Sequence, residues 1–370
     1  MKILLTFVII TFSIVQLVAA EPSNETNSHG NDDEKRSKAK HDVDEINQKN
    51  HGLWRAEIND RFALMEPEQK KKLAGSFTRR KNGNPNPPKN EQPNSDQPSD
   101  PQQSDNGTAP RVRRQISLPS SFDSRTKWPQ CAPIIGNIRD QSNCGSCWAV
   151  STGSVLTDRK CIAKVKTGQA VNPNSPSSWA SEADVMTCSG GSADGDGCNG
   201  GWPYKAFNSM VTKGVLSGTN YTWNAGCKPY PFPSTGGPYS AIGCSSTCST
   251  GSNDYSRTYM SSSTDLFDGS STYAQQMMQE IYNNGPVVAT MDVYEDFYYY
   301  ASGVYSYTYG AFQGGHAVRI IGWGSLNGVN YWLAANSWGK NWGQQGLFMI
   351  RRGVNEVYIE SEISYGAVKA

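Results

Sequence analysis

The spacing of apolar residues divides the chain into a short apolar start, a charged segment, a proline-rich segment and a large remainder. In the charged segment, residues 42–73, apolar side chains recur three to four positions apart, which predicts one face of an amphipathic helix. These side chains are Trp54, Ile58, Phe62 and Met65. Residues 82–108 contain six prolines and no aliphatic or aromatic residue. Because such a segment buries too little apolar surface to offset its ordering entropy, we predict a linker there.

The remainder, residues 118–370, contains helix patterns followed by strand patterns. One helix is predicted from Cys147 toward Lys160, and another over residues 273–283, where Gly285-Pro286 end it. The strand-like runs lie at residues 287–293, 316–322, 331–335 and 347–351. Helices that precede strands in this way predict an α+β fold with two lobes.

The apolar start has the features of a cleaved secretory signal. Residues 3–20 are mostly apolar, end in small side chains, and are followed by the polar pair Glu21-Pro22. A membrane anchor is the alternative, but several polar side chains dilute the run, so we expect removal of residues 1–20 and no anchor afterwards. Three Asn-x-Thr triplets are consistent with export, and they make glycosylation candidates of Asn24, Asn106 and Asn220.

Charge excludes one class of function and points to a processing site. The 370 residues have a formal net charge of +1, with both signs spread along the chain, so no basic stripe for nucleic acid is expected. The basic run Arg111-Val-Arg-Arg114 is of the kind that processing proteases cut. The predicted parts are therefore a signal at 1–20, a helical segment at 21–81, a Pro/Asn/Gln-rich linker with its processing site at 82–117, and a large domain at 118–370.

All nine cysteines follow the linker, and in an oxidising compartment their odd number leaves one thiol free. Within the stretch QSNCGSCWAV, Cys144 and Cys147 admit three interpretations: a redox pair, half of a zinc site, or a structural cysteine beside a nucleophile. Only His316 follows the linker, so zinc would need cysteines that the secretory path oxidises, and no metal is expected. A redox pair normally lies in a compact βαβ unit, which this neighbourhood does not resemble.

A nucleophilic cysteine needs a base, a group that orients the base, and donors for an oxyanion. Cys147 begins a predicted helix, and a helix N-terminus lowers the pKa of a thiol. His316 can act as the base, and the amide oxygen of Asn336, 20 residues later, can hold the ring. Trp338 can shield that hydrogen bond from water, and Gln141 can aim a side-chain N–H at the oxyanion. The nucleophile and each of its three requirements therefore have a candidate.

Three blocks of this sequence resemble the active-site blocks of papain-type cysteine proteases. They are Gln141-Ser-Asn-Cys-Gly-Ser-Cys-Trp148, Gly314-Gly-His-Ala-Val318 and Tyr331-Trp-Leu-Ala-Ala-Asn-Ser-Trp338. His316 follows Cys147 by 169 residues, a longer separation than in papain itself, which indicates an insertion. The inserted region, with Cys198-Asn-Gly-Gly-Trp-Pro203, and both ends of the large domain are similar to the cathepsin B branch.

The resemblance implies a papain-like α+β fold, with a helical lobe, a β-barrel-like lobe and the active site in the cleft between them. Cys147 and His316 would form a thiolate–imidazolium pair, with Asn336 and Gln141 in the supporting roles given above. Residues 21–81 would be a propeptide that lies in the cleft and keeps the enzyme latent until acid loosens it. The implied partners are protein and peptide substrates, the enzyme's own propeptide and cystatin-type inhibitors, and no cofactor is implied.

The same resemblance assigns disulfides and a substrate site. The implied disulfides are Cys131–Cys161, Cys144–Cys198, Cys188–Cys244 and Cys227–Cys248, which leave Cys147 as the free thiol. Gly200 and Gly201 would bind the substrate backbone, with Trp338 as a further substrate contact. The pocket for the second residue before the cut would be lined by Trp202, Pro203, Thr290, Ala317 and Glu362. A carboxylate at the floor of that pocket, from Glu362, would admit arginine as well as apolar side chains.

One departure from the cathepsin B pattern changes the expected activity. Cathepsin B removes C-terminal dipeptides with a flap that carries a pair of histidines. The 16 residues between Cys227 and Cys244, KPYPFPSTGGPYSAIG, contain no histidine. We therefore expect an endopeptidase with weak or no removal of C-terminal dipeptides.

Two other classes of protein are alternatives to this enzyme. A catalytically inactive, peptide-binding relative usually lacks one catalytic group, and a disulfide-rich binding protein of another fold would make the three blocks a coincidence. Residues 331–343 are similar to a motif of haemoglobin-digesting cathepsin B-like proteases in blood-feeding worms. A digestive role is thus expected, with lysosomal protein turnover as the alternative, in a secreted (extracellular or gut lumen) or lysosomal location.

Overall fold

The structure is a computed structural model that describes residues 25–79, 118–191, 197–234, 236–237, 239, 243–267 and 273–369. The predicted signal, the whole predicted linker with its processing site, and the glycosylation candidates Asn24 and Asn106 lie outside the described residues. Within the described ranges, no helix is long and apolar enough to cross a membrane.

The helical lobe is built around α6, Cys147–Lys166, which begins at the predicted residue. The residues of α6 from Cys147 to Arg159 are buried, because α5, α7 and α8 pack around the helix and the sheet lobe covers its remaining side. The other helical elements of the two lobes are α4 (Ser124–Lys127), η1 (Pro129–Cys131), α5 (Ala132–Ile135), η2 (Pro176–Ser178), α7 (Glu182–Cys188), α8 (Pro203–Thr212), α9 (Ala274–Asn284), η3 (Glu295–Tyr299) and η4 (Glu356–Tyr358).

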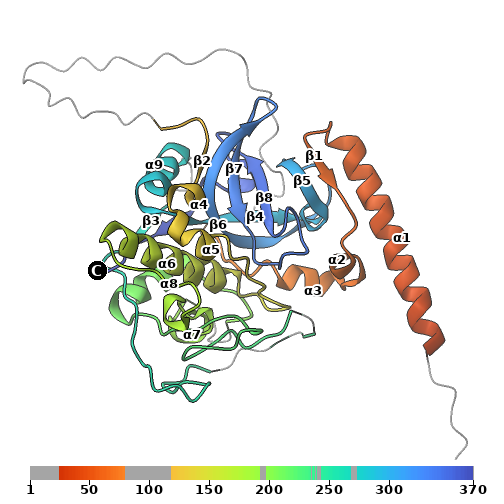
Figure 1. Ribbon diagram of the computed structural model, residues 1–370. Helices are drawn as coiled ribbons and strands as arrows, with labels where there is room; N and C mark the ends of the chain where they lie inside the picture. Colours follow the sequence, from red (N-terminus) through yellow and green to blue (C-terminus); the bar gives the residue numbers. More distant parts are fainter. Residues whose placement is uncertain are drawn as a thin grey trace, which may run out of the picture.

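The second lobe contains the sheet, in which the described strands follow the order β1-β5-β8-β7-β6-β4-β9-β3, with β2 paired to β6 (Figure 1). Only the β5–β8 pair is parallel among these strands. The strands are β1 (Trp54–Ala56), β2 (Phe122–Asp123), β3 (Thr264–Leu266), β4 (Val287–Tyr294), β5 (Tyr300–Tyr305), β6 (Phe312–Leu326), β7 (Val329–Ala335), β8 (Leu347–Arg351) and β9 (Ile363–Tyr365).

Strand β4 lies between the two lobes, and every one of its residues is buried. Val288 belongs to the apolar cluster of the helical lobe, whereas Val287 and Ala289 belong to the cluster of the sheet lobe. Because side chains alternate across a strand, β4 contributes to both cores at once. The predicted α+β fold with two lobes is confirmed, and the strands of the second lobe form an open sheet.

The helix and strand predictions for the large domain are confirmed within a few residues. The helix expected over 273–283 is α9, and Gly285 follows it with φ +102°. The four predicted strands lie within β4, β6, β7 and β8.

The prediction of one amphipathic helix over residues 42–73 is wrong. Helix α1 (Glu25–Lys49) ends before the apolar series begins, and His51 and Gly52 take φ values of 51° and 74°, which no helix continues. Trp54 then lies in β1, where it pairs with Gly303 of β5, and the side chain of Ile58 is 43% exposed. Pairing at the edge of the sheet therefore overrides the helical period in this segment.

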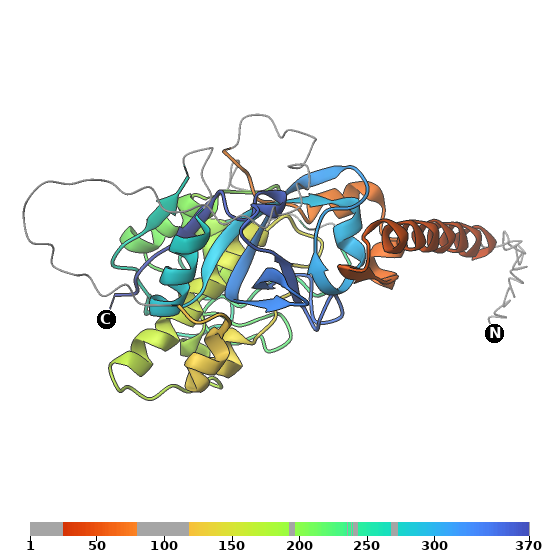
Figure 2. The same cartoon turned by 90° about the horizontal axis from the view of Figure 1, so that it is seen from above.

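The N-terminal segment, residues 25–79, crosses the outside of the sheet lobe and then passes between the lobes (Figures 1 and 2). Helix α1 projects along the β1–β5 side, and α2 (Asp60–Leu64) and α3 (Pro67–Lys72) follow it. Phe62 of α2 is fully buried, with its ring 5.4 Å from that of Tyr298 and 5.2 Å from that of Trp338. This aromatic contact anchors the segment at one end of the interlobe boundary.

Replacement of the anchor should loosen the N-terminal segment without unfolding the large domain. In Phe62→Ala, the lost contact and the cavity left behind should weaken docking by about 3 kcal/mol. We expect faster amide hydrogen exchange over residues 54–79, measured by mass spectrometry on the full chain. Ile58→Ala is the matched control, because its side chain is 43% exposed. Equal exchange in the two variants would contradict the anchor.

Candidate active site

The cleft between the lobes brings together the thiol and the imidazole that the sequence singled out. Cys147 is the first residue of α6 and the free cysteine among those described, and its side chain is fully buried. His316 lies on β6, opposite Met291 of β4. The backbone N–H of Ala317, the residue after His316, hydrogen-bonds to the thiol of Cys147. The helix N-terminus and the strand thus meet at the sulfur.

The orientation of the His316 ring follows from the partners of Asn336. The Oδ1 atom of Asn336 lies 2.8 Å from His316 Nε2 and also accepts the backbone N–H of Ser337 at 2.7 Å. Since a backbone N–H can only donate, the shared Asn336 atom is the oxygen, and His316 Nε2 carries the proton. Within the described residues, Nδ1 has no hydrogen bond of good geometry, and the carbonyl of Leu73 lies close to the imidazole. The ring of Trp338 covers this pair at 4.9 Å from the imidazole.

Gln141 is held so that its amide N–H groups point along the cleft. Its Nε2 donates to the carbonyl oxygens of Cys144, at 2.8 Å, and of Leu73, at 3.0 Å. Its Oε1 accepts the hydroxyl of Ser337 at 2.7 Å. Ser337 therefore fixes the amide of Gln141 as well as the oxygen of Asn336, a role that the sequence analysis missed. The sequence did contain a signal for this role, because Ser337 lies between two candidate site residues, Asn336 and Trp338.

Burial by the N-terminal segment keeps the thiol and the imidazole uncharged. Desolvation raises the pKa of Cys147 to about 11, against hydrogen bonds from the backbone of Ala317 and Gly75 that favour the thiolate. Desolvation also lowers the pKa of His316 to about 4, against the contacts with Asn336 and with the carbonyl of Leu73. At neutral pH both groups are therefore neutral while residues 73–75 cover them.

The backbone of the N-terminal segment contacts the predicted glycine pair. Gly201 donates to the carbonyl of Gly75 and accepts the N–H of Phe77, both at 2.9 Å, in a parallel bridge at Ser76. Gly200 has φ +105°, and a Cβ atom there would come 2.8 Å from the ring of Phe77. Only glycine at this position combines that conformation with so close an approach.

The residues predicted to line a side-chain pocket lie beside this backbone contact. Trp202 precedes Pro203 at the start of α8, and its ring is 5.4 Å from that of Phe77. Thr290 on β4 faces Ala317 on β6, and its N–H donates to the carbonyl of Glu362 at 3.0 Å.

The Glu362 carboxylate is 3% exposed and holds an arginine of the N-terminal segment. It accepts Arg79 Nε at 3.0 Å and the Arg79 backbone N–H at 3.3 Å. The same guanidinium bonds to Asp265 at 2.8 Å and stacks on Tyr204 and Phe267. A carboxylate so deeply buried is stabilised by this cation, and the site accepts a guanidinium.

Four disulfides stabilise the loops around the cleft: Cys131–Cys161, Cys144–Cys198, Cys188–Cys244 and Cys227–Cys248. They are the pairings that the resemblance implied. The Cys144–Cys198 bond ties the residue three positions before Cys147 to the loop that carries Gly200. Among the described residues, no group of three or more His, Cys, Asp and Glu side chains could hold a metal ion.

Comparison with known proteins agrees with this arrangement. A family model described as "Papain family cysteine protease" matches residues 118–367. A "Gut-specific cysteine proteinase" of Caenorhabditis elegans is 45% identical over 262 residues, covering 68% of this chain and 74% of the relative. A "Cathepsin B-like cysteine proteinase" of Schistosoma japonicum is 41% identical over 271 residues, covering 69% of this chain and 74% of the relative.

A solved structure extends the likeness to the N-terminal segment. The structure "proCathepsin B S9 from Trypanosoma congolense" has a TM-score of 0.68 and 34% sequence identity, and the match covers 89% of this chain and 97% of that one. The chain belongs to the papain family of cysteine proteases and is cathepsin B-like, with an N-terminal segment arranged as in a zymogen.

Proposed function

We propose that this chain is the zymogen of a cysteine endopeptidase in which Cys147 is the nucleophile. The single observation that carries the proposal is that His316 is held by Asn336 on the strand whose next residue, Ala317, hydrogen-bonds to the Cys147 thiol at the start of α6. In the mature enzyme, His316 takes the thiol proton, and the helix N-terminus stabilises the resulting thiolate.

The reaction then follows from the residues around the thiolate. Cys147 attacks a peptide carbonyl, and the oxyanion accepts hydrogen bonds from the Gln141 side chain and the Cys147 backbone N–H. The carbonyl of Leu73 already accepts the Gln141 amide in the zymogen, which supports that assignment. His316 protonates the leaving amine, and water then hydrolyses the thioester with His316 as the base.

Residues 25–79 act as the inhibitor in this proposal. They bury Cys147 and His316. The backbone of the segment passes through the cleft and runs parallel to the chain at Gly201. Ion pairs hold the segment to the large domain at each end of the path, Arg61–Asp140 and Arg79–Glu362. Release of the segment and maturation at acid pH are part of the proposal.

The proposed location is secreted or lysosomal, with a digestive role favoured. The predicted signal, the four disulfides and the gut-specific relative all support this assignment. The absence of histidine between Cys227 and Cys244 supports an endopeptidase with weak or no removal of C-terminal dipeptides. Cystatin-type inhibitors are proposed partners on the family resemblance alone.

A product map tests the endopeptidase assignment. Acid-matured protein should cut internal bonds of peptides with free and with amidated C-termini, and Cys147→Ala should cut neither, as read by mass spectrometry. Because residues 118–370 contain no histidine besides His316, no second imidazole can hold a terminal carboxylate, and amidation should change the rates by less than about threefold. Dipeptides released only from free C-termini would contradict the assignment, and an inactive wild-type chain would favour a peptide-binding relative.

The Glu362 carboxylate should select arginine at the second position before the cut. Glu362→Gln removes the charge that holds Arg79 in the zymogen, so kcat/KM for arginine relative to leucine at that position should fall about tenfold. Asp254→Asn is the matched control, since this exposed carboxylate hydrogen-bonds to Ser256 of its own loop. Equal ratios for the two variants would remove Glu362 from the pocket.

The thiol should react differently before and after maturation. A pKa of about 11 leaves about one Cys147 thiol in a thousand ionised at pH 8, so alkylation of the full chain should be slow and should accelerate as the pH rises. The matured enzyme should react rapidly between about pH 5 and pH 8, because its thiolate is already formed. Iodoacetamide labelling, read by mass spectrometry with Cys147→Ala as the control, measures both rates. Equal rates at neutral pH would contradict the proposed latency.

A further inference from the structure

The N-terminal segment marks a second charged site, at the end of the cleft opposite Glu362. Its contacts occur in chain order: Phe62 at Trp338, Leu73 at Gln141, and then Arg79 at Glu362. The thiol of Cys147 lies between these ends, because Gly75 contacts it. If the Glu362 side binds residues before the cut, as proposed above, the Trp338 side binds residues after it.

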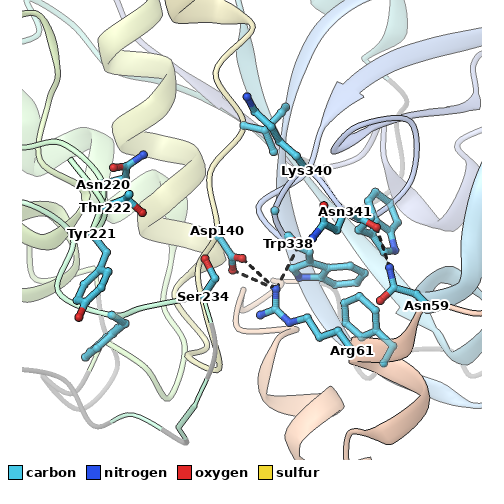
Figure 3. A pocket seen from close by; sticks show the side chains of 15 residues that line it. Asn59, Arg61, Asp140, Asn220, Tyr221, Thr222, Ser234, Trp338, Lys340 and Asn341 are labelled. Carbon is cyan, nitrogen blue, oxygen red and sulfur yellow. Dashed lines mark hydrogen bonds and ion pairs between the residues drawn. The ribbon is translucent and has the colours of Figure 1, made fainter. Parts of the chain in front are cut away.

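A pocket of about 400 Å³ opens on that side, and Arg61 reaches into it (Figure 3). Arg61 Nη1 donates to both carboxylate oxygens of Asp140, at 3.1 Å each, and to the carbonyl of Trp338, at 3.2 Å. Lys340 lines the same pocket, but among the described residues the ion-pair partner of Asp140 is Arg61. The pocket thus offers a carboxylate and a carbonyl, side by side, to a cation.

The Asp140 carboxylate is held in place by the surrounding backbone. Its Oδ1 accepts the N–H of Ser142 at 2.8 Å, and Asp140 bridges to Trp338 across the lobes. A Cβ atom at Gly339, where φ is +80°, would come 2.8 Å from Oδ2, so only glycine leaves room for the carboxylate. The site is therefore preformed, and it adjoins Gln141 directly.

Arg61 fills this site incompletely. Its Nη1 serves three acceptors, whereas its Nη2 is buried without a partner among the described residues. A guanidinium that approached with both nitrogens would form the parallel two-bond pair that carboxylates favour. A substrate arginine can therefore bind here at least as well as the arginine that maturation removes.

We propose that Asp140 and the Trp338 carbonyl form a guanidinium subsite that selects arginine after the cut and that Arg61 occupies in the zymogen. The inference rests on the proposed endopeptidase function. Arginine is preferred to lysine because its planar fork reaches the carboxylate and the carbonyl together. The indole of Trp338 packs against the aliphatic stem once Phe62 has left. The same carboxylate repels a substrate's C-terminal carboxylate, which disfavours dipeptide removal.

Peptides with arginine or citrulline after the cut test the subsite in the unaltered, acid-matured enzyme. Citrulline has nearly the shape of arginine without its charge, so the ratio of kcat/KM values isolates the ion pair. Because Asp140 and Arg61 are 18% and 23% exposed, we expect about a fivefold preference for arginine. Placing the pair first or second after the cut shows which position uses the subsite. No preference at either position would overturn the proposal.

Variants then assign the preference to Asp140. Asp140→Asn should reduce the arginine-to-citrulline ratio to about one, and Asp140→Glu should restore part of it. Glu362→Gln is the control, because it should change the ratio before the cut and leave the ratio after the cut as it was. An unchanged ratio in Asp140→Asn would overturn the subsite while leaving the endopeptidase intact. Absence of any Cys147-dependent cut would overturn both.

Discussion

The site depends on the hydrogen bonds that join the two lobes at Gln141 and Ser337. The Gln141 N–H donates to the Ser337 carbonyl at 2.8 Å, and the Ser337 hydroxyl donates to the Gln141 side chain at 2.7 Å. One of these residues precedes α6 and the other follows β7, so the pair fixes the thiol of one lobe against the imidazole of the other. Ser337 also donates to Asn336, and through it the same contact sets the tautomer of His316. A shift of these few atoms would separate all the groups that the chemistry needs.

The N-terminal segment uses the same cleft in a different way. Under this segment the His316–Asn336 hydrogen bond is 2.8 Å long. The segment removes water, and burial alone moves the pKa of Cys147 up and the pKa of His316 down. Charge separation between the two groups is therefore unfavourable under the cover, which is the physical basis of the proposed latency.

Much of the large domain could be predicted from the sequence, because its signals are local or lie in short motifs. The start of α6 at Cys147 and the strand that carries His316 follow from periodicity, and the spacing of three blocks identified the family. The N-terminal segment could not be predicted in the same way. Trp54 pairs with the edge of the sheet instead of continuing a helix, and that edge is formed by residues about 250 positions later in the chain. Nothing near Trp54 in the sequence carries this information.

The contacts of single polar side chains were also beyond the sequence. Ser337 and Asp140 are next to residues that were identified, yet their roles depend on which atom faces which partner across the lobes. Gly339 shows the same limitation, because the requirement for glycine at this position is apparent only once the Asp140 carboxylate is placed beside it. Sequence reasoning thus identified the family and the candidate residues, whereas the structure supplied the hydrogen bonds that orient each side chain.

Two ion pairs, one at each end of the cleft, link latency to substrate choice. Arg61 pairs with Asp140, and Arg79 pairs with Glu362. The segment that covers the cleft therefore binds it through arginine, the residue type that both sites are proposed to select in substrates. A stronger carboxylate site would hold a substrate arginine better but would also slow release of the segment at a given pH. Among the described residues Nη2 of Arg61 has no partner, so the proposed conflict is smaller at this end, where a single nitrogen of Arg61 contacts the carboxylate.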